Sequence, residues 1–305
     1  MAFFTRAWHR LRATWAPLPQ IDATQWLHTL RPYPFLHSLP LHEQARLRAL
    51  AAVFLQRKEF FGTHGLTVTD DMALSIAAQA CLPLLHWGSP QEALSWYDDF
   101  VGIVIHPGHA LAQRTTMDGA GVVHHYTEEL LGEAMQGGPV MLSWEAVTQG
   151  QQQTNQNVVI HEFIHKIDMR NGQADGYPPL PAHFMGLHQP QAARERWHDA
   201  WATAYAKFQQ QVQIAERFGG DWPWLDAYGA TAPAEFFAVC CEAYFTNPAR
   251  FQREFPSLMP LLNAFLRLPR STEAIEHRHR HSAQDFASFC SSTTQGQRVS
   301  LSEVG

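Results

Sequence analysis

The sequence predicts an α+β fold that is mostly helical and contains a small mixed or antiparallel sheet. Two observations lead to this class: long segments carry apolar residues at helical spacing, and only short stretches are rich in β-branched residues. The 305 residues, of which 46% are hydrophobic and 12% aromatic, can also bury a sizeable core. We therefore expect helices to supply most of that core and the sheet to be a minor part of it.

The N-terminal half begins with a segment rich in proline. We expect an irregular lead-in over the first forty residues, because prolines stand at positions 17, 19, 32, 34 and 40. Residues 42–61 have the apolar periodicity of a helix. Residues 65–71, GLTVTDD, predict a short strand, after which Asp70 or Asp71 begins the next helix.

Three further strands are predicted from β-branched or alternating stretches at residues 101–107, 121–127 and 139–144. We expect the last of them, PVMLSW, to lie at an edge of the sheet. An extended peptide could then pair with it by adding a strand.

Three helices are predicted in the C-terminal half. The first runs from roughly Asn155 to Arg170 and ends at the stop signal Asn171-Gly172. The second is an amphipathic helix over 193–218. The third begins near Thr231, with a proline in its first turn, and runs to Thr246.

Composition excludes several classes of function. The net charge of −6 and the pI near 6.3 provide no basic surface for nucleic acid. No apolar run is long enough for a signal peptide or a membrane span. Four cysteines do not form a disulfide framework or a zinc ribbon, because two of them are adjacent and none has a two-residue gap. These observations predict a cytoplasmic protein with reduced thiols.

The two ends of the chain differ from its middle. Residues 1–19 interleave aromatic residues with arginines and could form an amphipathic helix, which either packs on its own domain or lies on a membrane surface. Residues 271–305 are polar and lack periodicity, so we expect a loosely ordered tail. Its HRHRH segment, 277–281, is either a solvated charged stretch or a weak metal binder.

The motif His-Glu-Phe-Ile-His at residues 161–165 carries the strongest chemical signal. Positions i and i+4 lie on one face of a helix, so His161 and His165 can reach one metal ion. Zinc suits two imidazoles and a carboxylate and activates water at neutral pH, and Glu162 could take the proton of that water. Histidines satisfied within the core are the alternative, although burying such groups in an apolar helix costs stability unless they are paired or ligated.

A catalytic zinc ion needs a third protein ligand. Glu195 and Glu216 belong to an amphipathic helix and are expected to be solvated. Glu235 and Glu242 lie in an apolar helix; one could bind the metal and the other could support a ligand, and spacing does not choose between them. Tyr228, just before that helix, could donate its hydroxyl to the oxyanion or belong to the core.

Asp168 lies on the same helix face as the two histidines. It could accept the second ring N–H of a ligating histidine and thereby fix its tautomer. Alternatively, it could be a helix-end carboxylate that pairs with Lys166 or Arg170.

Longer strings around these residues resemble a known family. They are VTDDM with IAAQACLPLL, LLGEAMQGGPVMLSW, NVVIHEFIHKIDMRNG and LDAYGATAPAEFFAVCCEAYF. In this order they look like the Mlc titration factor A family of zinc-dependent peptidases. The similarity covers roughly residues 20–270 and implies a single peptidase domain over that range.

The resemblance implies a zincin-type core in which His161, His165 and Glu235 bind one zinc ion. It also implies that Glu162 is the general base, that Tyr228 assists the transition state, and that Glu242 supports a ligand. The family is known for aminopeptidase activity on peptide substrates and, in enteric bacteria, for binding the transcription repressor Mlc. The alternative is an interaction protein that sequesters such a repressor and has only secondary peptidase activity.

Overall fold

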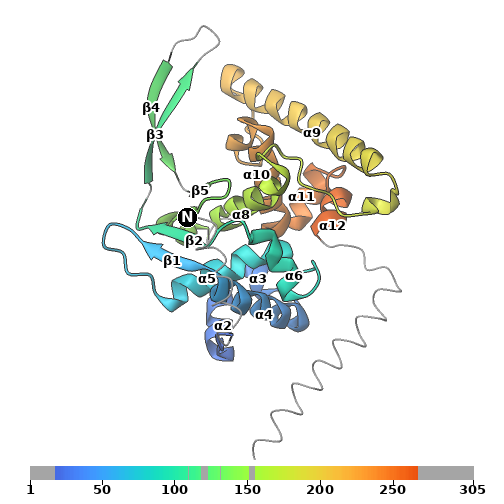
Figure 1. Cartoon of the computed structure of the whole chain (residues 1–305). Helices are drawn as coiled ribbons and strands as arrows, with labels where there is room; N and C mark the ends of the chain where they lie inside the picture. Colours follow the sequence, from blue (N-terminus) through green and yellow to red (C-terminus); the bar gives the residue numbers. More distant parts are fainter. Residues whose placement is uncertain (1–17, 109, 118–122, 131, 151–154, 267–305) are drawn as a thin grey trace, which may run out of the picture. The chain divides into compact units, whose positions relative to one another are not determined.

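The computed structural model describes residues 18–108, 110–117, 123–130, 132–150 and 155–266 (Figure 1). The expectations for residues 1–17, for the tail from Ser271 and for its HRHRH segment lie outside these residues. So does the fourth cysteine, Cys290. The three cysteines that the structure describes, Cys81, Cys240 and Cys241, are buried free thiols.

The main sheet has four short strands, β1 (Glu59–Gly62), β2 (Gly102–His106), β5 (Gly132–Ala134) and β6 (Val140–Ser143). Their order is β1-β2-β6-β5; β1, β2 and β6 are parallel, and β5 is antiparallel to β6. Strands β3 (Ala110–Met117) and β4 (Val123–Leu130) form a separate antiparallel pair. The predicted α+β fold with a small mixed sheet is therefore confirmed.

Most of the described residues are helical. The α-helices are α2 (Ala23–Leu30), α3 (Pro34–His37), α4 (Leu41–Arg57), α5 (Asp70–Cys81), α6 (Pro90–Leu94), α7 (Trp144–Gln149), α8 (Val158–Asp168), α9 (Pro190–Phe218), α10 (Pro233–Thr246), α11 (Pro248–Glu254) and α12 (Met259–Leu266). Short 3₁₀ helices are η1 (Leu82–Leu84), η2 (Ser95–Tyr97), η3 (Met169–Asn171), η4 (Phe184–Gly186) and η5 (Ala227–Ala230). Helices α8, α9 and α10 confirm the three helices predicted in the C-terminal half. Within the described part of the chain, no helix is long and apolar enough to cross a membrane.

From Leu18 onward, the described part of the first forty residues is not irregular, contrary to the prediction. Helix α2 is capped by Asp22, whose side chain accepts hydrogen bonds from the backbone of Thr24 and Gln25. Helix α3 begins at Pro34. Proline at the first helical position lacks only an N–H that would have no partner there. Two of the prolines, Pro34 and Pro40, therefore stand at or just before helix starts, where the sequence analysis took them as breaks.

The prediction of a strand at residues 65–71 is also wrong. The preceding helix ends earlier than expected, and the strand forms directly after it. Lys58 has extended backbone angles, and the next four residues form β1 instead of the last turn of α4. Residues 66–69 then form a connection without strand pairing. Thr69 caps α5 by accepting a hydrogen bond from Met72 N, so the helix begins at Asp70.

The expected edge strand is a third correction. Strand β6 is paired on both sides, by β2 and by β5, and its residues are largely buried. The edge next to it is β5, which the sequence analysis did not predict. Its three residues, Gly-Glu-Ala, have little intrinsic preference for a strand and are held by pairing with β6.

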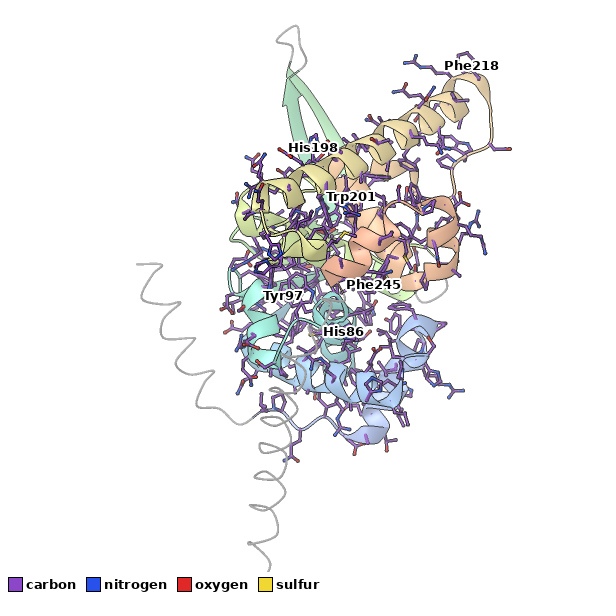
Figure 2. All side chains as sticks on the ribbon, turned by 90° about the vertical axis from the view of Figure 1, so that its right-hand side faces the viewer. His86, Tyr97, His198, Trp201, Phe218 and Phe245 are labelled. Carbon is purple, nitrogen blue, oxygen red and sulfur yellow. The ribbon has the colours of Figure 1, made fainter. Side chains whose placement is uncertain are left out.

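Helix α8 lies in the middle of the fold. It contacts α5, α7, α10, β5 and β6 (Figure 1). Phe163 is fully buried and packs against the rings of Phe54, Tyr97 and Phe100. A second aromatic cluster lies between α9, α10 and α12, where Trp201 is buried, whereas Phe218 at the end of α9 is exposed (Figure 2).

Two buried lysines flank the ring of Phe100. Lys58 Nζ donates to the carbonyl oxygens of Tyr97 and Phe100 at 2.5 and 2.6 Å and lies 3.6 Å from the ring centroid. Burial lowers the pKa of Lys58 to about 7, although the carboxylates of Asp99 and Asp98 oppose this shift. Lys166, on α8, lies 4.5 Å from the same ring centroid.

The shifted pKa of Lys58 predicts how stability depends on pH. An unfolded lysine binds a proton up to pH 10.5, so the unfolded state holds more protons between pH 7 and 10.5. The stabilising contribution that comes from the lowered pKa of Lys58 is fully present above pH 10.5 and is lost as the pH falls toward 7. The free energy of unfolding of the wild type, relative to Lys58→Met, should rise by about 2 kcal/mol from pH 7 to pH 9. Urea titrations measure this difference. The exposed Lys207→Met serves as a control, and a flat wild-type–Lys58→Met difference would contradict the shift.

Candidate metal centre and active site

The N-terminus of α8 is held by Asn157. Its Oδ1 accepts a hydrogen bond from Ile160 N at 2.9 Å, which caps the helix, and its Nδ2 donates to Gln79 Oε1 on α5 at 2.8 Å. Asn157 is buried, so these bonds fix where the first turn of α8 begins. One turn later, His161 and His165 project from a single face.

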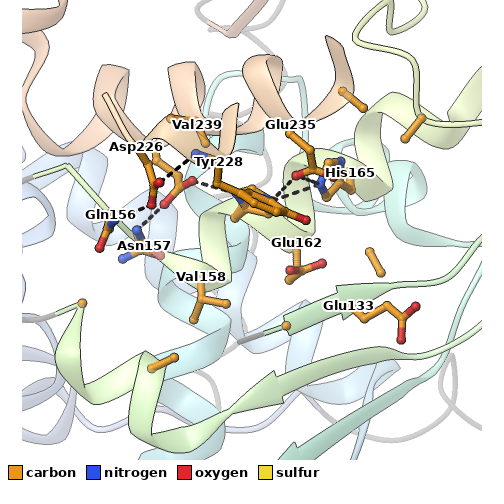
Figure 3. A pocket seen from close by; sticks show the side chains of 18 of the residues that line it. Glu133, Gln156, Asn157, Val158, Glu162, His165, Asp226, Tyr228, Glu235 and Val239 are labelled. Carbon is orange, nitrogen blue, oxygen red and sulfur yellow. Dashed lines mark hydrogen bonds and ion pairs between the residues drawn. The ribbon is translucent and has the colours of Figure 1, made fainter. Parts of the chain in front are cut away.

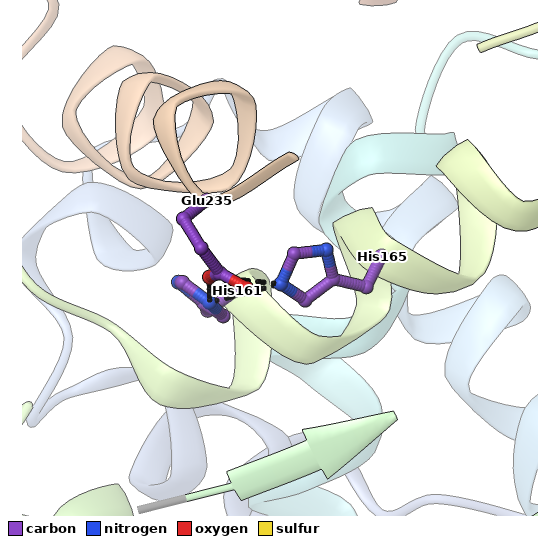
Figure 4. Close-up of side chains that lie close together, drawn as sticks. All are labelled: His161, His165 and Glu235. Carbon is purple, nitrogen blue, oxygen red and sulfur yellow. Dashed lines mark hydrogen bonds and ion pairs between the residues drawn. The ribbon is translucent and has the colours of Figure 1, made fainter. Parts of the chain in front are cut away.

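Helix α10 faces the two histidines. Pro233 begins α10, and Glu235 lies in its first turn. Helices α8 and α10 are in contact, which places the Glu235 carboxylate against both imidazoles (Figure 4). Glu235 Oε2 lies 2.9 Å from His161 Nε2 and 3.2 Å from His165 Nε2, and the two Nε2 atoms are 3.1 Å apart.

These three side chains fit a divalent metal ion. Two donors bound tetrahedrally to one zinc ion stand roughly 3.4 Å apart, so the observed separations are within a few tenths of an ångström of that arrangement. In addition, the two Nε2 atoms lie 3.1 Å apart and both face one carboxylate oxygen of Glu235. Two imidazole nitrogens and one carboxylate oxygen form a donor set that suits zinc. Among the residues that the structure describes, no other group of three or more His, Cys, Asp and Glu gathers in this way.

Glu242, two turns after Glu235 on α10, holds His161 from the other side. Its Oε1 lies 2.7 Å from His161 Nδ1, and its Oε2 accepts a hydrogen bond from the backbone N–H of Asn157. When Nδ1 carries the proton and donates it to Glu242, the lone pair of Nε2 faces Glu235 and His165. This contact therefore selects the tautomer that a metal needs.

The charged groups at this centre shift one another's pKa values. Burial lowers the pKa of His161, but the Glu242 and Glu235 carboxylates outweigh burial and raise this pKa well above its ordinary value. Burial would raise the pKa of Glu235, yet hydrogen bonds with His161 and His165 hold it well below its usual range. Without an ion, the centre therefore favours an imidazolium beside a carboxylate, and metal binding would release that proton.

A cavity of about 570 Å³ opens over the three side chains (Figure 3). Glu162 lines it without joining the His161–His165–Glu235 group; its side chain is 5% exposed, and burial raises its pKa. Tyr228 is 46% exposed, and its ring centroid lies 6.2 Å from that of His161. Asp226 accepts hydrogen bonds from Tyr228 N and from the Gln156 side chain, which ties the Tyr228 loop to the segment before α8.

The chain as a whole is similar to known proteins. Residues 5–267 match the model of the glucose-regulated metallo-peptidase M90 family. The chain belongs to this family. It is therefore a metallopeptidase by family, and the resemblance drawn from its motifs is confirmed.

Three relatives illustrate the similarity. Mlc titration factor A of Escherichia fergusonii is 34% identical over 241 residues, which cover 79% of this chain and 84% of that protein. Its namesakes from Salmonella arizonae and Salmonella gallinarum are each 33% identical over 235 residues. Those residues cover 77% of this chain and 87% and 82% of the two relatives.

Asp168 of this M90 chain takes neither of the two roles expected for it. Its Oδ2 accepts a hydrogen bond from Gly176 N at 2.7 Å, and burial raises its pKa to about 7. Its Oδ1 has no hydrogen-bond partner, and neither has His165 Nδ1, although both atoms are buried. Lys166, the alternative partner, binds Asp99 at 3.1 Å instead.

The other two glutamates considered as metal ligands lie away from the centre. Glu195 and Glu216 are exposed on α9, as expected of solvated residues. Sequence reasoning missed Asn157 and Gln79, whose contact joins two helices distant in sequence. Asn157 precedes an apolar helix, and this cap signal could have identified it; Gln79 had no such signal.

The contact between Glu242 and His161 predicts weaker metal binding when the carboxylate is replaced. Glu242→Gln keeps the shape but removes the charge and places an amide beside Asn157 N–H. We expect zinc affinity to fall about 10- to 100-fold, the range for partners of metal ligands. Competition with a chromogenic chelator measures this change. The exposed Glu254→Gln on α11 should leave the affinity unchanged, and equal affinities for both variants would show that Glu242 does not support the centre.

Proposed function

We propose that this M90 metallopeptidase is a zinc-dependent aminopeptidase in which His161, His165 and Glu235 bind the ion. The observation that carries the proposal is the meeting of two imidazole Nε2 atoms and one carboxylate oxygen at 2.9 to 3.2 Å. A donor set of two nitrogens and one oxygen favours zinc over calcium or magnesium, which take oxygen ligands.

Each neighbouring residue then has a chemical role. The zinc ion, when bound, polarises the scissile carbonyl and lowers the pKa of water to about 7. Glu162 takes the proton from the attacking water and delivers it to the leaving amine nitrogen. Its position supports this role, because Glu162 lines the cavity beside the His161–His165–Glu235 group without belonging to that group. Tyr228, half-exposed at the cavity, donates its hydroxyl to the oxyanion that develops on the carbonyl.

The charge of the cavity supports a preference for peptide N-termini. The charged side chains among the described lining residues are Glu133, Glu162, Asp226, Glu235 and Glu242. All are acidic, and the described lining includes no lysine or arginine. A free α-amine is positively charged and is attracted to these carboxylates, whereas the described lining offers a C-terminal carboxylate no lysine or arginine side chain. This favours an aminopeptidase over a carboxypeptidase.

Strand β5 provides a surface for the peptide backbone. It lines the cavity and, within the described residues, pairs with another strand on one side only. An extended substrate could hydrogen-bond to its other side and would then pass directly beside Glu162 and the histidines.

Replacing the general base tests the proposal. Glu162→Gln removes the proton acceptor but leaves His161, His165 and Glu235 in place. We expect kcat/KM on aminoacyl chromogenic substrates to fall by about two to four orders of magnitude while one zinc ion per chain is retained. Glu195→Gln, exposed on α9, should match the wild type. A Glu162→Gln variant with wild-type turnover would exclude Glu162 as the base.

Blocking the substrate amine tests the type of peptidase. N-acetylation removes the positive charge that the acidic cavity is proposed to attract. We expect acetylated peptides to be cleaved at least about 100-fold more slowly than their free counterparts, equivalent to roughly 3 kcal/mol of lost interaction. The measurement is kcat/KM for each matched pair. Equal rates for both forms would indicate an endopeptidase instead.

The names of the relatives favour a second activity, the binding of an Mlc-type transcription repressor. Such a partner implies a cytoplasmic location, with which the buried free thiols are consistent. In this alternative, peptidase activity is secondary. Purified repressor should then bind wild type and Glu162→Gln with equal affinity in calorimetry, and a repressor that binds neither would remove this alternative.

A further inference from the structure

The Glu162 carboxylate lies against the backbone of strand β5. A Cβ atom at Gly132 would stand 2.5 Å from Glu162 Oε1, 2.7 Å from its Cγ and 2.8 Å from its Cδ. These separations are shorter than any that Cβ atoms adopt with non-bonded atoms, so no side chain at position 132 is compatible with this position of Glu162.

The requirement at Gly132 is one of space and not of backbone conformation. Gly132 is not among the glycines with a positive φ, and it pairs in regular antiparallel register with Leu142 of β6. Any residue could adopt these backbone angles. Glycine is needed because the carboxylate occupies the volume of its missing side chain.

The same helix that carries Glu162 also fixes the strand. Lys166 lies one turn after Glu162, and its Nζ donates to the carbonyl oxygens of Met135 and Gly138 at 2.5 and 2.9 Å. These two residues belong to the turn that joins β5 to β6. Lys166 is fully buried and also pairs with Asp99, so the turn is anchored to α8. The backbone of β5 is therefore held in place beside the Glu162 carboxylate.

We propose that Gly132 is a positioning residue for Glu162. Because it has no side chain, the carboxylate can lie against the wall formed by β5 and point into the cavity. This inference rests on the proposed role of Glu162 as general base. It assigns to the third residue of the LLGEAM string a role that sequence periodicity does not reveal.

The Gly132→Ala substitution tests the inference. The added methyl group must displace the carboxylate, and a misplacement of about 1 Å can cost roughly 100-fold in rate. We therefore expect kcat on an aminoacyl chromogenic substrate to fall about 100-fold, with KM changed by less than about threefold. Zinc content should remain one ion per chain, because the clash involves Glu162 and none of the proposed ligands.

A double variant shows whether the clash with Glu162 is the cause. Glu162→Asp shortens the side chain by one methylene and so withdraws the carboxylate from the space that the new methyl group fills. The single Glu162→Asp variant loses activity, but Gly132→Ala should then add little further loss. The double variant should thus be within about threefold of Glu162→Asp alone, a strong departure from additivity.

Gly102→Ala is the matched control. Gly102 lies on β2 in the same sheet, and a Cβ there would meet only Pro139 Cβ at 3.6 Å and Phe61 Cε2 at 3.8 Å. These are ordinary contact distances, so we expect wild-type kcat and KM. The control separates the clash from the general effect of adding alanine to the sheet.

Each outcome has a distinct meaning. Wild-type kcat in Gly132→Ala, or losses that multiply in the double variant, would overturn the inference. If Gly132→Ala unfolds, a thermal melt of the double variant decides: recovery of the melting temperature supports the clash, and no recovery contradicts it. An inactive wild type, or an active Glu162→Gln, would instead overturn the proposed function.

Discussion

The contact between α8 and α10 places ionisable side chains inside the protein, and the surrounding structure compensates for them. Removing charged groups from water costs several kcal/mol each unless partners are supplied. His161 is held between Glu235 and Glu242, and the second oxygen of Glu242 binds the backbone of Asn157. The chain of polar contacts continues through Gln79 to Ser75 on α5. Helices α5, α8 and α10, which are distant in sequence, are therefore held together by one buried polar network.

Side chains on two faces of α8 contact different elements. The His161 and His165 side chains meet α10, whereas Glu162 and Lys166 meet strand β5 and its turn. Phe163 anchors the helix in the aromatic core. The donor group and the proposed base are thus fixed by the same rigid element, and small movements of α8 would disturb both. Such preorganisation is what acid–base chemistry beside a metal requires.

Local patterns accounted for much of this arrangement. The spacing of His161 and His165 predicted a shared face. The stop signals after α8 and α10 and the proline that begins α10 were also readable in the sequence. The choice between Glu235 and Glu242 was not, because it depends on how two helices meet. Strand β5 was missed for a related reason: a Gly-Glu-Ala strand exists through its pairing with β6 and not through its own propensity. Conversely, Phe60 and Phe61 continued a helical pattern but lie in β1, where pairing with β2 prevails.

In the proposed site, α8 and α10 together hold one zinc ion through two histidines and one glutamate. X-ray absorption at the zinc edge, on purified protein with its metal content measured, tests this arrangement most directly. The account predicts one zinc ion per chain, with nitrogen and oxygen donors at about 2.0 to 2.2 Å, including two imidazoles, and no sulfur. Sulfur donors at about 2.3 Å would contradict it, as would a chain that binds no zinc.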